Sequence, residues 1–578
     1  MPATLLRWLD NTERFVQRKK TAGNARSKRK TKGMSKIIIY QCFPRWFTNY
    51  VTARVPHGDK EVNGCGTFAG ITTKALKGIQ ELGATHVWYT GVIRHATAKL
   101  NTPAITKGKA GSPYAITDYY DVDPDLAEFP DNRMAEFEML VSRTHKAGLK
   151  VIIDFVPNHV SREYKSACRP QGVEDLGERD HPEWAFSPLN NFYYIPGEKF
   201  QPSFAIGDYN EYPAKVTGND CFNAHPSEND WYETVKLNYG VHYMGGCEKQ
   251  FNPIPDTWSK MCDILLFWAG KGVDAFRVDM AHMVPAEFFD WAIHRVRAVF
   301  PQVQFIAEIY DPGIYRRYIS AGFDYLYDKV GMYDYLRGVT SRDYSADGIS
   351  YQWQAAGDVL PKMLYFLENH DEQRIASGFF CGSGRAAEPA MIVASTLSTN
   401  PVMIYSGQEI GEKGMDVEGF SGIDGRTTIF DYWGVKSIQA WANGGKFNGA
   451  GLDDEQRELR TFYCKLLQIA KTNPAITDGK MYDLEYAQGE GFNRRKQFAY
   501  LRKHEKETLL IVVNFDDRQV DVPVTIPSDA FIYMQIDEKI SVHAEDLLSG
   551  KTYEGPLMSS APFCVTLPAW TGAILRLR

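Results

Sequence analysis

Short runs of apolar and β-branched residues alternate with longer segments of helical periodicity from residue 37 onward. This alternation is typical of βα units around a parallel sheet, and eight such units fit a closed barrel better than an open sheet. The sequence therefore predicts an α/β fold, a (β/α)8 TIM barrel, with helices such as 133–147 and 285–300 between its strands. The eight strands are expected at residues 37–41, 85–89, 150–154, 273–278, 304–307, 323–327, 363–367 and 401–405.

Two stretches depart from this alternation. Residues 159–248 are rich in Asn, Pro, Gly and aromatic residues without clean periodicity, and long connections of this kind form subdomains or functional lids. This stretch predicts an inserted subdomain after strand 3 that forms one wall of a binding cleft. After about residue 475 the pattern changes to strands at 497–503, 508–515, 564–567 and 572–577, which predicts a C-terminal all-β sandwich domain.

A chain of 578 residues exceeds what one hydrophobic core usually supports, so several domains are expected. We predict a basic, disordered tail, a catalytic barrel in two segments, the inserted subdomain and the C-terminal sandwich. Their boundaries are expected at 1–34, at 35–158 with 249–475, at 159–248 and at 476–578.

The first 33 residues differ in charge from the rest of the chain. They carry ten Lys and Arg against two acidic residues, whereas the remainder carries 55 against 69. Such a tail fits a nucleic-acid or membrane-surface arm, an Arg-rich transit peptide, or a disordered extension translated from upstream of the true start. We favour the extension because Met34-Ser35-Lys36 directly precedes the first predicted strand. The acidic remainder argues against a nucleic-acid partner.

Nine cysteines are scattered along the chain without a Cys-x-x-Cys pair. This pattern is unlike a disulfide framework and favours a reducing compartment. The sequence has no run of about 18 apolar residues that would span a membrane, and its first 33 residues lack the apolar core of a signal peptide. We therefore expect a cytoplasmic location and no membrane partner; the sequence predicts no oligomeric state.

Polar residues follow four of the predicted strands, at the ends where barrel enzymes carry reactive groups. Cleavage of a glycoside requires a carboxylate against the anomeric carbon and a protonated acid beside the leaving oxygen. Arg277 would keep Asp279 ionised, as a nucleophile requires, and the apolar Phe305-Ile-Ala before Glu308 favours a protonated acid. A single carboxylate at a strand end is more often a helix cap or an ion-pair partner. The residues that also fit a buried, hydrogen-bonded barrel rim are Asp154, for which we prefer that structural role, His159, Arg277 and His370.

Together these four segments resemble the signature regions of the α-amylase superfamily, glycoside hydrolase family 13, in order and in strand placement. They are Asp154-Phe-Val-Pro-Asn-His159, Gly272-Val-Asp-Ala-Phe-Arg277-Val-Asp279, Phe305-Ile-Ala-Glu308 and Phe366-Leu-Glu-Asn-His370-Asp371. Further similarity lies in Gly111-Ser-Pro-Tyr114-Ala-Ile-Thr-Asp118-Tyr-Tyr and in Asn400-Pro-Val-Met-Ile-Tyr-Ser-Gly407-Gln408-Glu409. The resemblance extends from about Lys36 to the last residue.

The resemblance implies a role for each matching residue. Asp279 would be the nucleophile that forms a glycosyl-enzyme intermediate, Glu308 the acid that then acts as base, and Asp371 a ligand of sugar hydroxyls that stabilises the distorted transition state. In addition, His159 and His370 would donate hydrogen bonds to the sugar, Arg277 would orient Asp279, and Tyr114 would stack beneath the ring or be an ordinary core aromatic.

The remaining positions near these motifs leave alternatives open. His282 lies where members often carry a Lys or another polar residue on the leaving-group side, so it would either touch substrate or cap the following helix. The aromatic residues of the insertion would be sugar platforms or, for the most part, the core of that subdomain. They include Trp184, Phe192, Tyr193, Tyr194 and Trp231.

Many members of the superfamily bind a structural calcium ion near the inserted subdomain. Of the expected ligands, this sequence plainly retains Asn158, whereas Met283 stands where a His is expected and Lys236 where an Asp is expected. Thioether and ammonium groups are poor partners for a hard cation that prefers oxygen. We therefore predict no cofactor and no metal ligand at this position, although a different oxygen cluster could still hold calcium.

The leading functional hypothesis is retaining hydrolysis of α-1,4-glucosidic bonds in starch-like glucans or maltodextrins, as a starch-degrading enzyme. A close alternative is transglycosylation, or hydrolysis of an α-1,6 linkage, trehalose or sucrose, because all of these share the first half-reaction. A distant alternative is a non-catalytic binding subunit, which the three intact carboxylates disfavour. The motifs do not determine linkage, chain length or the choice between endo and exo attack.

Overall fold

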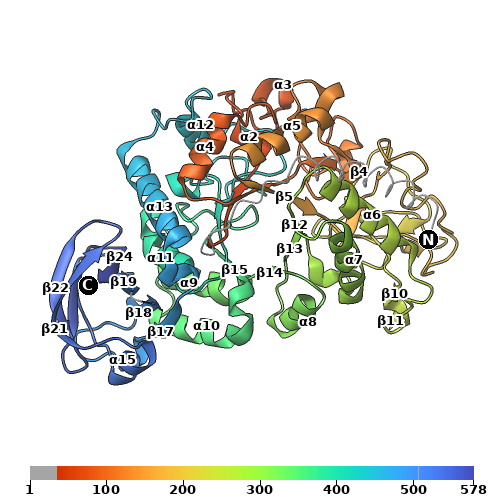
Figure 1. Cartoon of the computed structure of the whole chain (residues 1–578). Helices are drawn as coiled ribbons and strands as arrows, with labels where there is room; N and C mark the ends of the chain where they lie inside the picture. The colour runs from red at the N-terminus through yellow and green to blue at the C-terminus, as the bar shows by residue number, and fades with distance from the viewer. Residues whose placement is uncertain (1–34, 506) are drawn as a thin grey trace, which may run out of the picture.

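The computed structural model describes residues 35–505 and 507–578. At its centre, eight parallel strands close into a barrel in the order β1-β16-β15-β14-β13-β12-β5-β2 (Figure 1). This confirms the predicted TIM barrel, and each strand lies within two residues of its predicted limits. The strands are β1 (Ile38–Cys42), β2 (His86–Tyr89), β5 (Lys150–Phe155), β12 (Ala275–Val278), β13 (Gln304–Ala307), β14 (Tyr325–Tyr327), β15 (Met363–Phe366) and β16 (Val402–Tyr405).

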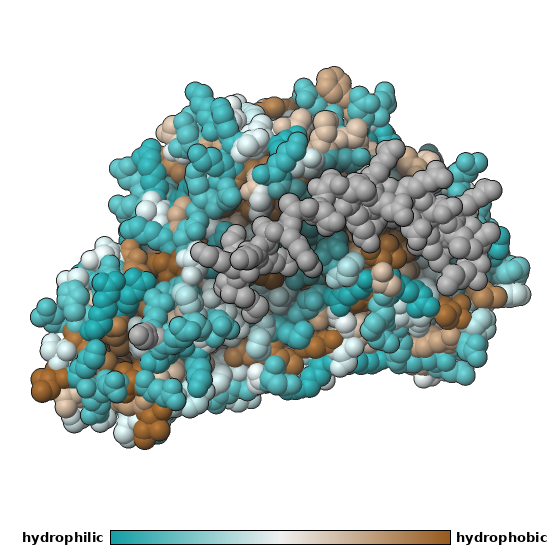
Figure 2. Space-filling view, viewed as in Figure 1, coloured by the Kyte–Doolittle hydropathy of each residue, from teal (hydrophilic) through white to brown (hydrophobic). Residues whose placement is uncertain are grey.

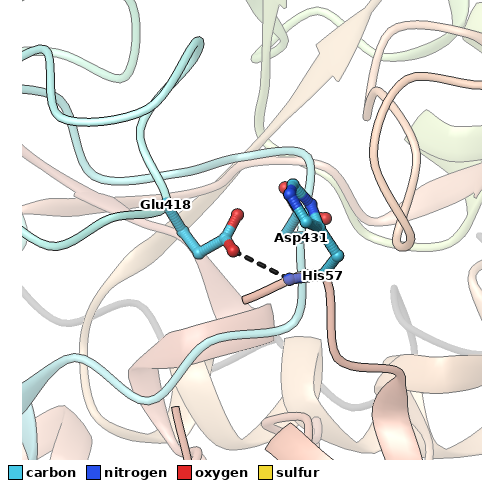
Figure 3. Close-up of side chains that lie close together, drawn as sticks. All are labelled: His57, Glu418 and Asp431. Carbon is cyan, nitrogen blue, oxygen red and sulfur yellow. Dashed lines mark hydrogen bonds between the residues drawn. The ribbon is translucent and has the colours of Figure 1, made fainter. Parts of the chain in front are cut away.

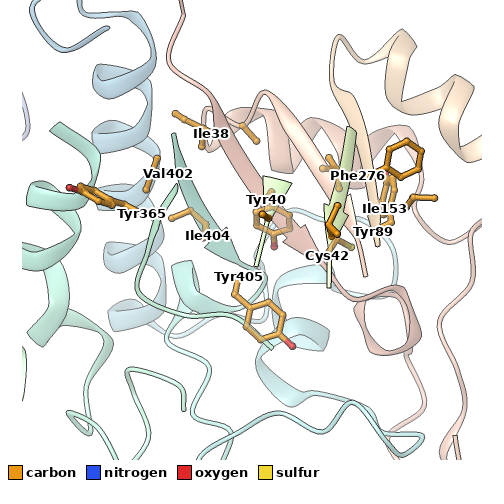
Figure 4. Packing of buried hydrophobic residues seen from close by; sticks show 14 of the residues in the cluster. Ile38, Tyr40, Cys42, Tyr89, Ile153, Phe276, Tyr365, Val402, Ile404 and Tyr405 are labelled. Atoms are coloured by element: carbon orange, nitrogen blue, oxygen red, sulfur yellow. The ribbon is translucent and has the colours of Figure 1, made fainter. Parts of the chain in front are cut away.

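The barrel strands are buried on both faces because successive side chains point to opposite sides of a strand. Ile39, Trp88 and Ile152 belong to a small cluster with residues from the other barrel strands, which fills the interior. Their neighbours along the strands, such as Tyr40 and Ile153, belong to the large cluster between strands and helices (Figure 4). This double burial explains why the strands read as continuous apolar runs in the sequence.

Helices surround the barrel, and the predicted helices at 133–147 and 285–300 are confirmed. In α7 (Ala286–Val299), Phe289, Ile293 and Val296 recur at helical spacing and are buried. The other helices of this region are α2 (Pro44–Phe47), α3 (Lys60–Asn63), α4 (Thr73–Glu81), α5 (Arg133–Lys146), α6 (Asp256–Gly270), α8 (Tyr315–Ser320), α9 (Asp334–Thr340), α10 (Ile349–Ala356), α11 (Glu388–Thr396), α12 (Lys436–Ala442), α13 (Asp454–Thr472) and α14 (Pro474–Thr477).

The segment between β5 and α6 contains three short antiparallel strand pairs that the sequence did not predict. They are β6 (His159–Ser161) with β9 (Thr234–Lys236), β7 (Tyr194–Ile195) with β8 (Ala214–Lys215), and β10 (Val241–His242) with β11 (Glu248–Lys249). Strands of two or three residues are too short to leave a periodic pattern. Of the aromatics expected in this subdomain's core, Phe192, Tyr193 and Tyr194 are buried, whereas Trp184 is exposed. A further pair, β3 (Ile93–His95) with β4 (Ile116–Val122), precedes α5.

The C-terminal part contains a six-stranded sheet, β17-β18-β19-β24-β21-β22, and a two-stranded sheet, β20-β23. Alternate residues of the large sheet, such as Leu501 and Leu510, share a core with Val522 and Val565 of the small sheet. This confirms the C-terminal sheet domain, and its strands near 497, 508, 564 and 572 were predicted. The elements are β17 (Lys480–Asp483), β18 (Gln497–His504), β19 (Glu507–Asn514), β20 (Val520–Val524), α15 (Ser528–Met534), β21 (Lys539–Asp546), β22 (Thr552–Leu557), β23 (Phe563–Leu567) and β24 (Thr571–Leu577).

The other face of the large sheet packs on the barrel helices. Tyr500, Ile511 and Ile574 belong to the same cluster as the barrel core, and a Cβ atom at Gly572 would lie 2.8 Å from Cδ1 of Ile392 in α11. Glycine therefore allows β24 to approach α11 closely. The two parts of the molecule share one continuous core.

The predicted disordered tail over residues 1–34 lies outside the described residues, and the exact domain boundaries stay predictions. Within the residues that the structure describes, no helix has the length and apolarity to cross a membrane. On the face drawn in Figure 2, hydrophilic residues predominate and hydrophobic residues are scattered among them, as is normal for a protein surface.

Candidate active site

Arg277, in β12, links two of the predicted catalytic carboxylates. Its Nη1 lies 2.7 Å from Oδ1 of Asp279, and its Nη2 lies 2.7 Å from Oε1 of Glu308. Nη1 is also 3.5 Å from Oδ1 of Asp154. Asp279 and Glu308 directly follow the neighbouring parallel strands β12 and β13, whose residues 278 and 307 are paired. The barrel register therefore brings Asp279 and Glu308 to one guanidinium; the sequence had predicted the contact of Arg277 with Asp279 but not that with Glu308.

Glu308 is buried and accepts two further hydrogen bonds. The backbone amide of Met280 donates to Oε2 at 2.9 Å, and the hydroxyl of Tyr310 donates to Oε1 at 2.5 Å. Met280 has a φ of 42°, a left-handed conformation that is uncommon for a residue with a side chain and that clusters at functional sites. Glu308 is thus fixed from three sides by Arg277, Met280 and Tyr310.

Asp371 reaches the same site from the segment after β15. Its Oδ2 lies 3.2 Å from Nε2 of His370, and 38% of its side chain is exposed. Nε2 of His370 also lies 2.5 Å from the Tyr114 hydroxyl, and Nδ1 accepts a hydrogen bond from Gln41 Nε2 at 2.9 Å. Burial lowers the pKa of His370 well below its usual value, and Arg277 adds to this. The ring is therefore neutral, and its Nε2 faces Tyr114 and Asp371.

Several carboxyl groups meet around Arg277, and the pKa values of Asp154, Asp279 and Asp371 are raised. Burial raises the pKa of Asp279 well above its usual range, the Glu308 charge adds to this, and Arg277 opposes it. Loss of hydration also raises the pKa of Asp371 to about 7, with Glu308 again adding. Arg277 favours the ionised form of Asp279, as predicted, but burial and the Glu308 charge favour the protonated form. Like charges at close range disfavour one another's ionisation, and this adds to the effect of burial on the pKa of Asp279 and of Asp371.

Asp154 belongs to the hydrogen-bonded rim, in line with the structural role that we preferred. Its Oδ2 accepts from the indole N–H of Trp88 at 3.0 Å and from the amide of Gly91 at 3.3 Å. The Tyr114 hydroxyl lies 3.4 Å from Oδ1. Burial raises the pKa of Asp154 to about 6.

Tyr114, for which two roles were open, is only partly buried. Its ring stacks on the His370 ring, with 5.3 Å between the centroids, and the guanidinium carbon of Arg277 lies 5.5 Å from its centroid. The ring therefore lies within the charged network rather than in an apolar core.

His159 and His282 lie beside the network. The His159 ring packs edge-on against Trp231, and its Nδ1 lies 3.2 Å from Asn158 Nδ2. His282 is in the 3-10 helix η5 (Ala281–Met283), with its ring 6.0 Å from that of Tyr310. The cap of α7 is Pro285, so His282 does not cap that helix. Its Nδ1 is buried without a hydrogen-bond partner among the described residues.

The sequence did not identify Tyr310, Gln41, Trp88 or Arg426 as members of the site. Tyr310 had a usable signal because it lies two residues after Glu308, on the same side of an extended segment. The contact of Arg426 with the backbone oxygen of Asp371, at 2.7 Å, joins residues 55 positions apart, and no local pattern predicts it.

Two other groups of acidic residues lie outside this site. In the first, His57, Glu418 and Asp431 lie together (Figure 3). The His57 amide donates to Glu418 and the Lys109 amide to Asp431, each at 2.9 Å. In the second, Asp121 pairs with Arg94 and Arg133, and Asp118 accepts the amides of Ala167 and Cys168. These carboxylates already have protein donors, as structural polar groups usually do.

The position at which relatives would hold calcium has a different donor set here. The ammonium group of Lys236 lies 2.8 Å from Oδ1 of Asn158, the amide oxygen expected to bind the metal. A cation of the protein itself thus contacts the retained ligand. The residues present do not fit a calcium ion at this position.

The comparisons agree with this geometry. The family model of the alpha amylase catalytic domain matches residues 41–307. The chain is 25% identical, over 84% of its length, to alpha-1,4-glucan:maltose-1-phosphate maltosyltransferase of Cereibacter sphaeroides, of which it covers 61%. It is 23% identical to Maltase 1 of Drosophila virilis, over 65% of this chain and 58% of the maltase. It is also 24% identical to Alpha-amylase 3 of Dictyoglomus thermophilum, over 70% of this chain and 74% of that protein. The chain thus spans less than two thirds of the length of the maltosyltransferase and the maltase.

Solved structures share the fold over most of this chain. The maltogenic alpha-amylase AmyB from Thermotoga neapolitana superposes with a TM-score of 0.62 at 19% identity, covering 93% of this chain and 98% of AmyB. The debranching enzyme of Nostoc punctiforme superposes with a TM-score of 0.62 at 19% identity. The match covers 94% of this chain and 100% of the debranching enzyme. These likenesses establish the fold.

Proposed function

Residues 41–307 belong to the α-amylase catalytic-domain family, and from this premise we propose that the protein is a retaining glycoside hydrolase. Its proposed substrates are the α-1,4-glucosidic bonds of starch-like glucans or maltodextrins. The observation that carries the proposal is the single guanidinium of Arg277, which holds Asp279 and Glu308 at adjacent strand ends.

The shared guanidinium favours a retaining mechanism. Carboxyl oxygens that each lie 2.7 Å from one terminal nitrogen of the same guanidinium are close neighbours. Retaining glycosidases hold their two carboxyl groups about 5 Å apart, whereas inverting enzymes need roughly 6.5–9.5 Å to admit a water molecule. We assign Asp279 as the nucleophile and Glu308 as the acid and then the base.

The ion pair between Arg277 and Asp279 supports this division of roles. A retaining reaction begins with one carboxylate ionised and the other protonated. Burial raises the pKa of Asp279 and so works against an ionised nucleophile, whereas Arg277, whose Nη1 lies 2.7 Å from Oδ1 of Asp279, opposes this effect. In the proposed first step, the Asp279 carboxylate attacks the anomeric carbon while Glu308 gives its proton to the departing oxygen. Water, deprotonated by Glu308, then cleaves the glycosyl–Asp279 bond.

Other groups remain available to a bound sugar. Asp371 has a partly exposed side chain beside His370, and the neutral His370 ring stacks on Tyr114. His282 has a buried Nδ1 without a partner among the described residues, and buried polar atoms are normally hydrogen-bonded. We assign these residues to substrate binding, with His282 touching substrate on the leaving-group side, and we keep His159 as a further binding residue.

A transglycosylase is the second candidate because a maltosyltransferase is among the relatives, at 25% identity over 84% of this chain. Both candidates use the same first step and differ in whether water or a sugar hydroxyl attacks the intermediate. Action on an α-1,6 linkage, trehalose or sucrose would differ only in the shape of the pocket. We also propose a role in starch degradation and a cytoplasmic location, supported by nine cysteines that are all free in the described part of the chain.

The proposal is tested by product analysis with matched variants. Purified protein is incubated with maltooligosaccharides, soluble starch, pullulan, trehalose and sucrose, and products are followed by chromatography. Short maltooligosaccharides from starch are expected, with a loss of at least about 1,000-fold in rate for Asp279→Ala because the nucleophile is absent. The control is Asp324→Asn, another arginine-paired Asp, which lies before the start of β14. It is expected to turn over normally per folded molecule.

The other outcomes of this panel separate the hypotheses. Products longer than the input would favour a transglycosylase. Release of glucose from trehalose or sucrose alone would replace the α-glucan assignment with another α-glucoside. Turnover of no substrate by the folded wild type would overturn the enzymatic proposal.

A further inference from the structure

Lys236 is a buried cation with oxygen atoms of two different segments around it. Its side chain is 2% exposed, and its Nζ lies 2.6 Å from Oδ1 of Asp220 and 2.8 Å from Oδ1 of Asn158. Nζ also lies 5.2 Å from the centroid of the Tyr243 ring, within the range of a cation–π contact. A carboxylate, an amide oxygen and an aromatic face therefore surround one ammonium group.

These contacts join separate parts of the chain. Asn158 follows the barrel strand β5, Lys236 ends β9, and Asp220 lies in the turn around residues 217–221, with a φ of 65°. The amide group of Asn158 also donates to the backbone oxygen of Gly218 in that turn at 2.8 Å. Lys236 and Asn158 thus hold the turn against the end of the barrel strand.

The turn packs directly on a predicted substrate-binding residue. A Cβ atom at Gly218 would lie 3.0 Å from Cβ of His159 and 2.5 Å from the Thr234 hydroxyl. Such spacing disfavours any residue larger than glycine at position 218 and shows that the turn lies directly against His159. Any displacement of the turn would therefore alter the position of the His159 ring.

We propose that the ammonium group of Lys236 takes the place of a structural metal ion, holding the 217–221 turn to Asn158 and thereby positioning His159. Its importance for catalysis rests on the proposed function, but its structural role does not. Asn158 and Asp220 offer the amide and carboxylate oxygens that a hard divalent cation prefers. The fixed positive charge satisfies both oxygens and would repel such a cation from the same place. Lys236 is thus a positioning residue, two or more contacts away from the reacting atoms.

The first test exchanges the internal cation for a metal ligand. Lys236→Asp would place a second carboxylate beside Asn158 and Asp220, so this variant is expected to be several degrees less thermostable than the wild type in EDTA. Millimolar calcium chloride is expected to restore most of the loss. The wild type should show a smaller calcium response or none. Equal responses of the two chains to calcium would overturn the proposal.

The second test removes the charge while keeping the length of the side chain. Lys236→Met is expected to unfold at a lower temperature, whether calcium is present or not, and to raise KM for maltooligosaccharides several-fold with a smaller change in kcat. The matched control is Lys215→Met, which removes a partly exposed lysine of the same insertion paired with Glu211. Wild-type stability and wild-type KM in Lys236→Met would contradict the proposal.

The tests also separate this inference from the proposed function. Recovery of KM in Lys236→Asp on addition of calcium would show that the cation acts on substrate binding, which a general loss of stability would not explain. If the wild type hydrolyses no glucan, the proposed function fails, while the EDTA and calcium unfolding curves still decide whether Lys236 replaces a metal ion.

Discussion

At the residue scale, the site is organised by one arginine among several carboxyl groups. Arg277 contacts Asp154, Asp279 and Glu308, and its charge also acts on Asp371. A planar guanidinium with several fixed donors can bridge carboxylates in a way that a lysine ammonium cannot. Arg277 lies in the barrel strand β12, and 1% of its side chain is exposed. The barrel backbone therefore fixes the position of its guanidinium.

The raised carboxyl pKa values predict the acid side of the pH–activity profile. Asp279 must be ionised to act as nucleophile, and its pKa lies well above its usual value of 3.8, while that of Asp371 is about 7. Activity should therefore fall as pH falls below about 7, where Asp371 takes up a proton. The plot of kcat/KM against pH reports the free enzyme, and an acid limb near pH 4 would contradict this prediction.

The same raised pKa values make the folded protein less stable as pH rises, whereas activity is expected to increase over that range. A carboxyl whose pKa is higher in the folded chain than in the unfolded chain binds its proton more tightly when folded. Its stabilising contribution is present at pH values below the unfolded pKa near 4 and is lost as pH rises toward 7. Asp279 and Asp371 therefore cost stability as pH rises toward 7, the range in which the proposed mechanism needs them ionised.

The sequence could place the proposed catalytic residues together because each follows a recognisable strand. Asp279 and Glu308 end consecutive apolar runs, and parallel strands in register bring such ends together. Tyr310 was missed although it had a local signal. The partners Gln41 and Arg426 contact His370 and Asp371 across 329 and 55 residues, and such pairings depend on loop conformations that periodicity does not encode.

At the scale of elements, the insertion is held by polar contacts more than by regular structure. Its strands have two or three residues, and a small apolar cluster contains Phe200 and Ala214. Beside this cluster, the guanidinium carbon of Arg162 lies 3.8 Å from the centroid of the Phe200 ring. Its Nη1 lies 2.7 Å from Oε1 of Glu211. Sequence patterns predicted that this segment forms a subdomain, but its order depends on contacts between distant residues.

Arg162→Met is therefore expected to destabilise the insertion strongly. It leaves the buried carboxylate of Glu211 without its closer cation and with only the more distant Lys215, at 3.8 Å. Breaking a buried ion pair costs about 3–5 kcal/mol. Thermal unfolding and limited proteolysis between residues 197 and 230 measure the effect. The control is Arg179→Met, which removes an exposed partner of Glu174 and should cost about 0–1 kcal/mol. Equal protease resistance of the two variants would argue against this role for Arg162.

At the scale of the whole molecule, the C-terminal sheet and the barrel depend on each other. Arg502 in β18 is 2% exposed and donates to the backbone oxygens of Leu397, Ala475 and Ile476 at 2.8–2.9 Å. Tyr500 of the same strand lies 2.5 Å from the hydroxyl of Thr396 in α11. Because the sheet also contributes residues to the barrel core, we expect wild-type unfolding in denaturant to be a single transition.

Arg502→Met is expected to lower the unfolding free energy by more than about 3 kcal/mol, since hydrogen bonds to a charged group contribute about 1.5–3 kcal/mol each. Denaturant unfolding followed by fluorescence and by circular dichroism measures this loss. Arg576→Met, which removes a half-buried partner of Glu507 on the same sheet, is the control. If both variants lose the same small amount, Arg502 does not join the two parts of the molecule.

The contact at Gly572 also bears on how this protein can change in evolution and in the laboratory. A Cβ atom at this position would lie only 2.8 Å from Cδ1 of Ile392 in α11. A residue larger than glycine on the sheet therefore requires a smaller residue on the helix. A C-terminal sheet transplanted from a relative would carry side chains fitted to another helix. Swapped chimaeras should therefore need α11 from the same donor to keep this close contact between sheet and helix.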